Sequence, residues 1–210
     1  MAILSRSKRI FDFVRSILGP ETIDKIPDKL VFNIMTDVSR RLAEETLCIE
    51  QSEDLTVVAG TELYDEPDGF YRMKHLKVPS GALLVLQESE IDEINTIRTD
   101  IPNSFAQAPT YFYRWNGQIG LFPAPQAAGT YTVYYYALPV TELSTSVSPA
   151  TPYYMDDAIK YGVLAELLPI LGKDNQGVMY RQFYEGQLAR AVNRHAATKS
   201  NSHNILYHDV

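Results

Sequence analysis

The sequence contains a single cysteine, Cys48, among its 210 residues. One thiol excludes a disulfide framework and a zinc site built from cysteines, and it removes the main sequence argument for a secreted protein. The P-loop, the G-x-G-x-x-G nucleotide motif and the G-x-S-x-G nucleophile elbow are also missing. Nothing in the sequence therefore argues for an enzyme.

Long apolar runs are missing as well. The longest candidate for a membrane span, residues 161–171, contains Glu166 and Pro169. It is shorter than the roughly 20 apolar residues that a bilayer requires. Residues 1–20 carry 4 basic side chains and 1 acidic one, which leave no uninterrupted apolar core for a signal peptide. We therefore expect synthesis in the cytoplasm and no contact with a membrane.

Positive charge is scarce. The formal net charge is −7, and between residues 50 and 100 there are 12 acidic side chains against 4 basic ones. Affinity for DNA comes mostly from Lys and Arg side chains that replace the counterions of the phosphates. Tight binding of nucleic acid is therefore disfavoured.

Helical periodicity marks both ends of the chain. Apolar residues recur at helical spacing over residues 7–18, 27–48, 151–168 and 174–199, with Pro169 expected to end the third of these helices. The apolar positions of the last helix are Val178, Phe183, Leu188, Ala191 and Val192. Each helix carries an apolar stripe that needs another element to cover it.

Between residues 50 and 150 the apolar period changes from near 3.6 to near 2. Short runs rich in β-branched, aromatic and Leu residues alternate with turns that contain Gly or Pro, which predicts strands. The predicted strands in the first half of this region are residues 55–58, 62–64, 73–78 and 83–87. Acidic residues at the start of residues 90–96 predict one short helix there.

The strongest local signal is Asn116-Gly117, which lies between two aromatic runs. Asn-Gly tolerates the positive φ angles of a type I′ turn, so it predicts a two-residue hairpin. The expected cross-strand pairs are Trp115 with Gln118, Tyr113 with Gly120, Tyr111 with Phe122 and Phe112 with Leu121. Both faces of this hairpin carry apolar bulk, so we expect both faces to pack on other elements.

The order of helices, strands and helices predicts an α+β protein. In it a helical bundle, formed by the N- and C-terminal helices, holds an inserted antiparallel β domain. The predicted bundle comprises residues 1–49 and 151–199, the β domain comprises residues 50–150, and residues 200–210 form a C-terminal tail.

No group of residues predicts catalysis. Asp156-Asp157 and Asp92-Glu93 are adjacent carboxylates, but neighbours in a helix point about 100° apart, so we interpret them as charges at helix starts. The four histidines are His75, His195, His203 and His208, and none has metal-ligand spacing with another His, Cys or acid. Cys48 has no nearby His to activate it. We therefore predict no catalytic residue, no metal site and no cofactor.

Aromatic side chains are concentrated in residues 111–136. A platform that stacks carbohydrate or single-stranded nucleic acid needs one exposed aromatic face, whereas these rings fall on both faces of their strands. We therefore favour core packing and subunit contacts, and we expect a sheet interface at Tyr111, Tyr113, Trp115 and Tyr135. A carbohydrate-binding module stays an alternative.

Three motifs follow one another in a defined order: residues 56–67 (TVVAGTELYDEP), 113–125 (YRWNGQIGLFPAP) and 131–139 (YTVYYYALP). Residues 157–162 (DAIKYG) and a final helix follow them. In order and spacing these motifs resemble the head-to-tail adaptor (connector) proteins of tailed bacteriophages, notably short-tailed ones. The resemblance covers about residues 27–195.

The resemblance implies a structural protein of the virion, assembled in the host cytoplasm and placed at the head-tail junction. Adaptors of this kind form a homo-oligomeric ring, typically a dodecamer, between the portal protein ring and a tail nozzle or tube protein. Genomic DNA passes through the channel of the ring without specific binding. A tail-tube or baseplate component is the alternative within the same class of structural proteins.

The end of the chain combines a polar segment with an apolar cluster. Residues 198–204 are too polar to bury a helical face, but Ile205, Leu206 and Tyr207 are apolar. A terminal segment can become ordered on a partner, so we expect these three residues to dock on the portal or on a neighbouring subunit. Packing of the tail on its own subunit is the alternative.

Overall fold

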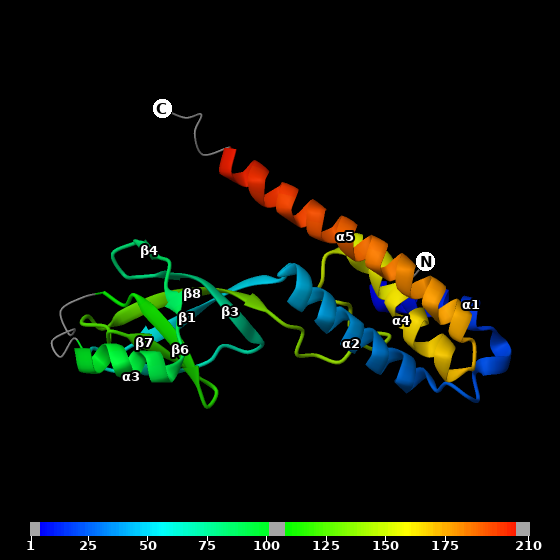
Figure 1. The fold of residues 1–210 in the computed structure, drawn as a ribbon, viewed down its shortest axis with the longest axis horizontal. Coiled ribbons are helices and arrows are strands. Elements are labelled where there is room, and N and C mark those ends of the chain that lie inside the picture. Colours follow the sequence, from blue (N-terminus) through cyan, green and yellow to red (C-terminus); the bar gives the residue numbers. More distant parts are fainter. Residues whose placement is uncertain (1–4, 101–107, 205–210) are drawn as a thin grey trace. The chain divides into compact units, whose positions relative to one another are not determined.

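The computed structural model describes the backbone of residues 5–100 and 108–204, and the side chains of residues 5–99 and 108–194. The chain divides into two compact units (Figure 1). Residues 1–49 and 138–210 form a helical unit, and residues 50–137 form a β unit. This α+β organisation, with helices from both ends of the chain and strands between them, confirms the predicted fold class.

The helical unit has one apolar core to which α1 (Arg6–Leu18), α2 (Asp28–Thr46) and α4 (Asp156–Ile170) contribute. Its other elements are η1 (Pro20–Thr22), η3 (Tyr153–Met155) and α5 (Asp174–Asn204). Val14 of α1, Leu42 of α2 and Ile159 of α4 are fully buried in one core. The apolar stripes of the N-terminal helices are therefore covered by the C-terminal ones, because neither half could bury its stripe alone.

Helix α4 differs from its prediction at its end. Pro169 was expected to stop the helix, but it lies inside α4, which ends at Ile170. A proline this close to the C-terminus removes a single helical hydrogen bond, so the helix continues past it. The ring also packs on α5: a Cβ atom on Gly177 would lie 2.7 Å from Cγ of Pro169. The glycine lets the two helices approach closely.

The connection before η3 belongs to the helical unit, whereas the sequence placed it with the β domain up to residue 150. Leu143 is buried in the helical core, and its backbone N–H donates to Oγ1 of Thr36 at 2.9 Å. The hydroxyl of Ser7 donates to the carbonyl of Val147. These contacts hold residues 138–150 on α1 and α2, so the β unit ends at Ala137.

The β unit contains two four-stranded sheets and one helix. Its elements are β1 (Glu50–Val57), β2 (Leu63–Asp65), β3 (Phe70–Lys77), β4 (Leu83–Leu84), β5 (Gln87–Glu88), α3 (Ile91–Asp100), β6 (Tyr111–Trp115), β7 (Gln118–Phe122) and β8 (Gly129–Ala137). The strand orders are β1-β8-β3-β4 and β2-β7-β6-β5. Pairing is antiparallel with one exception, since β5 and β6 run parallel. That pair departs from the predicted antiparallel domain.

The hairpin of β6 and β7 has the predicted register. Tyr113 pairs with Gly120 and Tyr111 pairs with Phe122, as expected from the Asn-Gly turn. Asn116 has φ 51° and Gly117 has φ 74°, the positive values that a type I′ turn needs.

Both faces of the hairpin are covered. On one face Tyr113 and Phe122 pack with Ile94 of α3, which is fully buried. On the opposite face Phe112 and Leu121 are buried at 2% and 0% exposure. The expectation that both faces pack on other elements is therefore confirmed.

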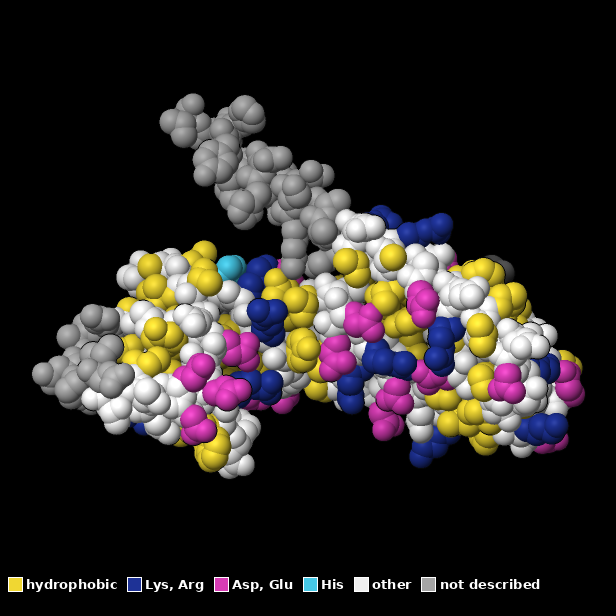
Figure 2. Space-filling view, in the orientation of Figure 1, with side chains coloured by type: hydrophobic (Ala, Val, Ile, Leu, Met, Phe, Trp, Pro, Cys, Tyr) yellow, Lys and Arg dark blue, Asp and Glu magenta, His cyan; other side chains and the backbone are white. Residues whose placement is uncertain are grey.

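The net charge is confined to one unit. The β unit holds 12 acidic and 5 basic side chains, whereas the helical unit holds 14 of each. On the face shown in Figure 2, acidic side chains gather on the β unit, while acidic and basic side chains alternate over the helical unit. The β unit therefore carries the full charge of −7.

Candidate interaction surfaces

The adjacent carboxylates lie at helix starts, as interpreted from the sequence. Asp156 and Asp157 are in the first turn of α4, where the helix dipole favours negative charge. Asp92 and Glu93 take the same place in α3. Within residues 5–99 and 108–194, no three His, Cys, Asp or Glu side chains come together in a way that could hold a metal ion.

Cys48 and His75 are a thiol and an imidazole whose pKa values are shifted from their usual range. Burial raises the pKa of the Cys48 thiol. His75 lies half-buried in β3, its Nδ1 atom has no hydrogen-bond partner, and burial together with the Lys74 charge lowers its pKa. The side chains of His195, His203 and His208 lie outside the described residues. No helix in the described part of the chain is long and apolar enough to span a bilayer.

The four aromatic residues predicted at a sheet interface lie in different surroundings. Tyr113 and Tyr135 are buried, at 4% and 3% exposure. Tyr111 is half-buried beside the α3 contact, and Trp115 is 53% exposed at the hairpin turn. The structure thus places two of these rings inside the β unit, where Tyr113 packs with Ile94 of α3 and Tyr135 lies against Phe70 of β3. Trp115 alone among the four is broadly exposed.

A polar network ties α3 to the hairpin. The hydroxyl of Tyr113 donates to Oε1 of Glu62 at 2.8 Å. The guanidinium of Arg98 in α3 donates to both oxygens of the same carboxylate, at 2.6 and 2.8 Å. Burial and the hydrogen bond to Glu62 raise the pKa of Tyr113 to about 12. The network is structural, since it joins α3, β6 and the segment that precedes β2.

Gly120 makes room for the Tyr113 ring. A Cβ atom at this position would lie 2.1 Å from Cζ of Tyr113, so the ring covers the glycine directly. The sequence analysis paired these two residues but did not derive this contact. A large ring opposite a glycine in an antiparallel pair is a signal that could have indicated it.

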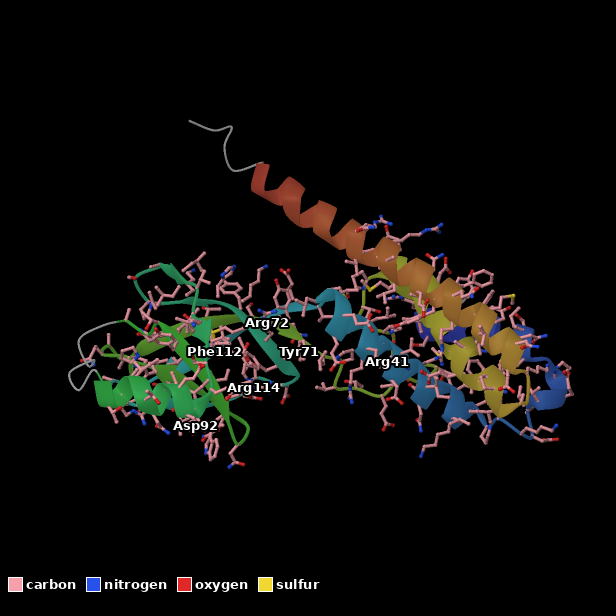
Figure 3. All side chains as sticks on the ribbon, in the orientation of Figure 1. Arg41, Tyr71, Arg72, Asp92, Phe112 and Arg114 are labelled. Atoms are coloured by element: carbon pink, nitrogen blue, oxygen red, sulfur yellow. The ribbon has the colours of Figure 1, made fainter. Side chains whose placement is uncertain are left out.

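Arg114 holds the other side of the hairpin. Its Nε and Nη2 atoms donate to the two oxygens of Glu66 at 2.6 and 2.8 Å, in the planar bidentate arrangement typical of Arg and carboxylate. Its guanidinium also lies 5.3 Å from the ring centre of Phe70. Arg114 and the neighbouring Tyr71, whose carbonyl accepts from it, are labelled in Figure 3.

A small cavity of about 230 Å³ lies among α2, α4 and α5. Arg41, labelled in Figure 3, forms an ion pair with Glu166 at its edge. The buried hydroxyl of Tyr184 has no hydrogen-bond partner there, and burial raises the pKa of Tyr184 to about 12. An unpaired buried hydroxyl destabilises the fold.

Helix α5 exposes apolar side chains that the sequence analysis counted as its covered stripe. Val178, Phe183 and Val192 are 59%, 48% and 42% exposed. At about 100° per residue these three positions point in different directions, which is a signal that could have separated them from the stripe. The residues that contact the rest of the unit follow helical spacing: Tyr180, Tyr184, Leu188 and Ala191. Ala191 is buried, as expected.

A groove of about 310 Å³ lies on the exposed side of α5. Tyr161 of α4 and Phe183 of α5 line it, with ring centres 5.7 Å apart. Gly186 also lines it, and nothing lies within 4 Å of where its Cβ would be. Gln182, Gln187 and Arg190 complete its lining, and a groove that combines aromatic and polar side chains is typical of a contact surface between proteins.

The exposed apolar residues of α5 and the groove beside them are thus suited to contacts between macromolecules. Such surfaces indicate a protein of the assembly class. Residues 10–205 match the family described as SU10 adaptor protein, and the chain belongs to this family. No curated protein matches the chain. The family is one of phage adaptors, so the resemblance seen in the sequence is confirmed, and the chain is a structural component of a virion.

Proposed function

We propose that this protein is a head-to-tail adaptor whose subunits form a ring between the portal ring and the tail nozzle or tube. The observation that carries the proposal is the family match, which extends through both units from residue 10 to residue 205. The ring extends the DNA channel and connects the portal to the tail. Its role is structural rather than catalytic.

The exposed face of α5 supports a role in assembly. The helix has 31 residues, which corresponds to about 46 Å at 1.5 Å per residue. It carries Val178, Met179 and Phe183 at 59%, 41% and 48% exposure, more apolar surface than a single unit needs. In a ring these side chains contact neighbouring subunits or the portal.

The charge of the β unit supports passage of DNA without specific binding. A balance of −7 in 88 residues offers few cations to replace the counterions of the phosphates. The same charge separates subunits in solution. We therefore expect the isolated protein to be monomeric in light scattering until a portal ring brings copies together.

The C-terminal residues are the proposed portal anchor. Ile205, Leu206 and Tyr207 lie outside the described residues, and α5 leads the chain to Asn204 immediately before them. Three buried apolar side chains contribute about 1.5 to 3 kcal/mol each before the entropy of ordering is subtracted. Repetition around a ring converts a modest gain per subunit into strong attachment.

The test is negative-stain imaging of the full chain mixed with the portal ring of the same phage. We expect a second ring on the portal for the wild-type protein, and none for a deletion after Lys199 that unfolds at the wild-type temperature. The matched control replaces His203, Asn204 and His208 by Ser and keeps the apolar cluster, so it should dock normally. A truncated protein with wild-type affinity contradicts the anchor, and a wild-type protein that never binds the portal contradicts the proposed function.

A further inference from the structure

The two sheets of the β unit end in strands of unequal length. Three of their four edges are short, because β2 has 3 residues and β4 and β5 have 2 each. The fourth edge, β1, has 8 residues. An unpaired edge presents backbone N–H and C=O groups that another strand can bind, and proteins usually keep such edges short.

Strand β1 offers a regular edge. It pairs with β8 from Glu50 to Val57 without a register shift, whereas the β3 pairing with β8 has two irregularities. Residues 51–54 and Thr56 are exposed, and the strand contains no proline. Every second residue of β1 directs its backbone groups away from β8. Glu50, Glu53 and Asp54 are its exposed acidic residues.

The opposite edge of the same sheet, β4, is apolar. The N–H of Val78 donates to the carbonyl of Ala82 at 3.0 Å, and Leu84 faces Leu76 two residues further along. Because hydrogen-bonded pairs alternate in an antiparallel ladder, Leu84 directs its backbone groups toward β3. The backbone groups of Leu83 and Val85 therefore point outward, and these side chains are 60% and 78% exposed.

We propose that β1 of one subunit pairs with β4 of the next, so that this sheet continues from copy to copy around the ring. The inference rests on the proposed ring function. Neighbouring strands in the order β1-β8-β3-β4 are all antiparallel, so β1 and β4 run in opposite directions. A second copy placed beside the first in the same orientation brings its β1 antiparallel to β4 of the first copy. Strand directions then continue to alternate across the boundary between the two copies.

Charge selects this pairing over the pairing of two β1 strands. Two β1 strands side by side would bring Glu53 and Asp54 of one copy against the same acids of the other, which is destabilising. The short β4 strand, Leu83–Leu84, carries no charge. The occupant of each edge is therefore the unlike edge of a second copy.

A lysine on β3 adds attraction across the joint. Lys74 of β3 reaches Glu50 of β1 at 2.7 Å, with β8 lying between the two strands. Lys77 of β3 pairs with Leu83 of β4, which lies on the side of β3 away from β8. It is placed to reach an acid of the neighbouring β1 across β4 in the same way.

When β1 of one copy pairs with β4 of another, the dimer still has one unpaired β4 edge and one unpaired β1 edge. Such contacts grow until a ring closes, or continue as a filament when the rotation does not close. The contact at β4 is short and the β units repel one another, so the joint is weak without a template. Higher ionic strength screens this repulsion and should promote assembly of the wild-type protein.

The first test is chemical cross-linking of subunits assembled on the portal ring, in a Cys48→Ser background. Thr56→Cys marks β1 and Val85→Cys marks β4. The reagent is a bismaleimide shorter than about 14 Å, the width of three strand spacings, so that it cannot join the two edges of one copy. We expect a ladder of multimers from the double variant, dimers alone from a mixture of the single variants, and no product from either single variant.

The second test blocks the edge without cysteines. Val85→Pro removes an outward-facing N–H that has no backbone partner within the described residues, whereas Val85→Thr keeps it. Both variants should fold and attach to the portal through their tails, but Val85→Pro should fail to close a ring. A closed ring of Val85→Pro, or dimers from Thr56→Cys alone, overturns the edge pairing and leaves the adaptor function intact. A wild-type protein that forms no ring on the portal overturns both.

Discussion

Arg6 connects α1 to the segment that leads into α4 inside the helical unit, and its removal gives a sharp test of the fold. Its Nη1 atom donates to the carbonyl of Pro149 at 3.0 Å and to that of Thr151. Its Nη2 atom donates to the carbonyl of Pro152 at 2.8 Å, and the guanidinium pairs with Asp156. The Arg6 side chain is 14% exposed, so water replaces few of these bonds.

We expect Arg6→Ala to lower the free energy of unfolding by about 3 kcal/mol. Breaking a buried ion pair by removing one partner costs about 3 to 5 kcal/mol. The lower end applies because Asp156 is 21% exposed and lies at the start of α4, where the helix dipole stabilises it. For a chain of this length, 3 kcal/mol corresponds to a melting temperature lower by about 6 to 12 °C.

Two further variants separate charge from geometry. Arg6→Lys keeps a positive charge for Asp156 but loses the planar fork that serves three carbonyls, so its effect should be intermediate. Arg9→Ala removes an exposed arginine from the same helix and should change stability by no more than about 0.5 kcal/mol. The assay is urea unfolding followed by the helical far-UV circular dichroism signal. If Arg6→Ala were as mild as Arg9→Ala, the role assigned to Arg6 would be wrong.

Four other substitutions and a change of pH should affect stability in defined ways under the same assay. Gly120→Ala should cost about 1 to 3 kcal/mol because its methyl group meets the Tyr113 ring, whereas Gly186→Ala, with open space around it in a helix, should stabilise by up to about 1 kcal/mol. Tyr113→Phe should destabilise because Glu62 loses one of its hydrogen-bond donors and keeps only Arg98, but Tyr184→Phe should be neutral or stabilising because that hydroxyl has no partner; equal effects would refute the contrast. Unfolded tyrosines ionise near pH 10, at about their usual pKa, and folded Tyr113 and Tyr184 ionise at about 12, so wild-type stability should fall between these pH values and fall less in Tyr113→Phe.

Local patterns predicted the elements that depend on local chemistry. The hairpin register followed from Asn116-Gly117, because the turn type aligns the residues on either side of it. The helices of both ends followed from apolar spacing, whereas the N-cap of α1 at Ser5, whose hydroxyl accepts from the N–H of Lys8 at 3.1 Å, was seen only in the structure. Membership of the adaptor family followed from the order of several motifs.

Contacts between distant residues could not be predicted in this way. The parallel pairing of β5 with β6 joins two residues to a strand that lies beyond α3, and no local pattern specifies that partner. Likewise, Arg6 in a polar N-terminal sequence gives no sign that it will bind the carbonyls around Thr151. The exposed apolar residues of α5 belong to the same group, since exposure depends on what packs against the helix.

The sequence by itself determined the order of helices and strands, the position of the hairpin and the family, because each depends on residue spacing along the chain. Tertiary structure alone decided which strands became the edges of each sheet, and so left β1 and β4 open on opposite sides of one sheet. These properties arise from long-range pairing, in which a strand's neighbours are set by the packing of the whole unit rather than by its own residues.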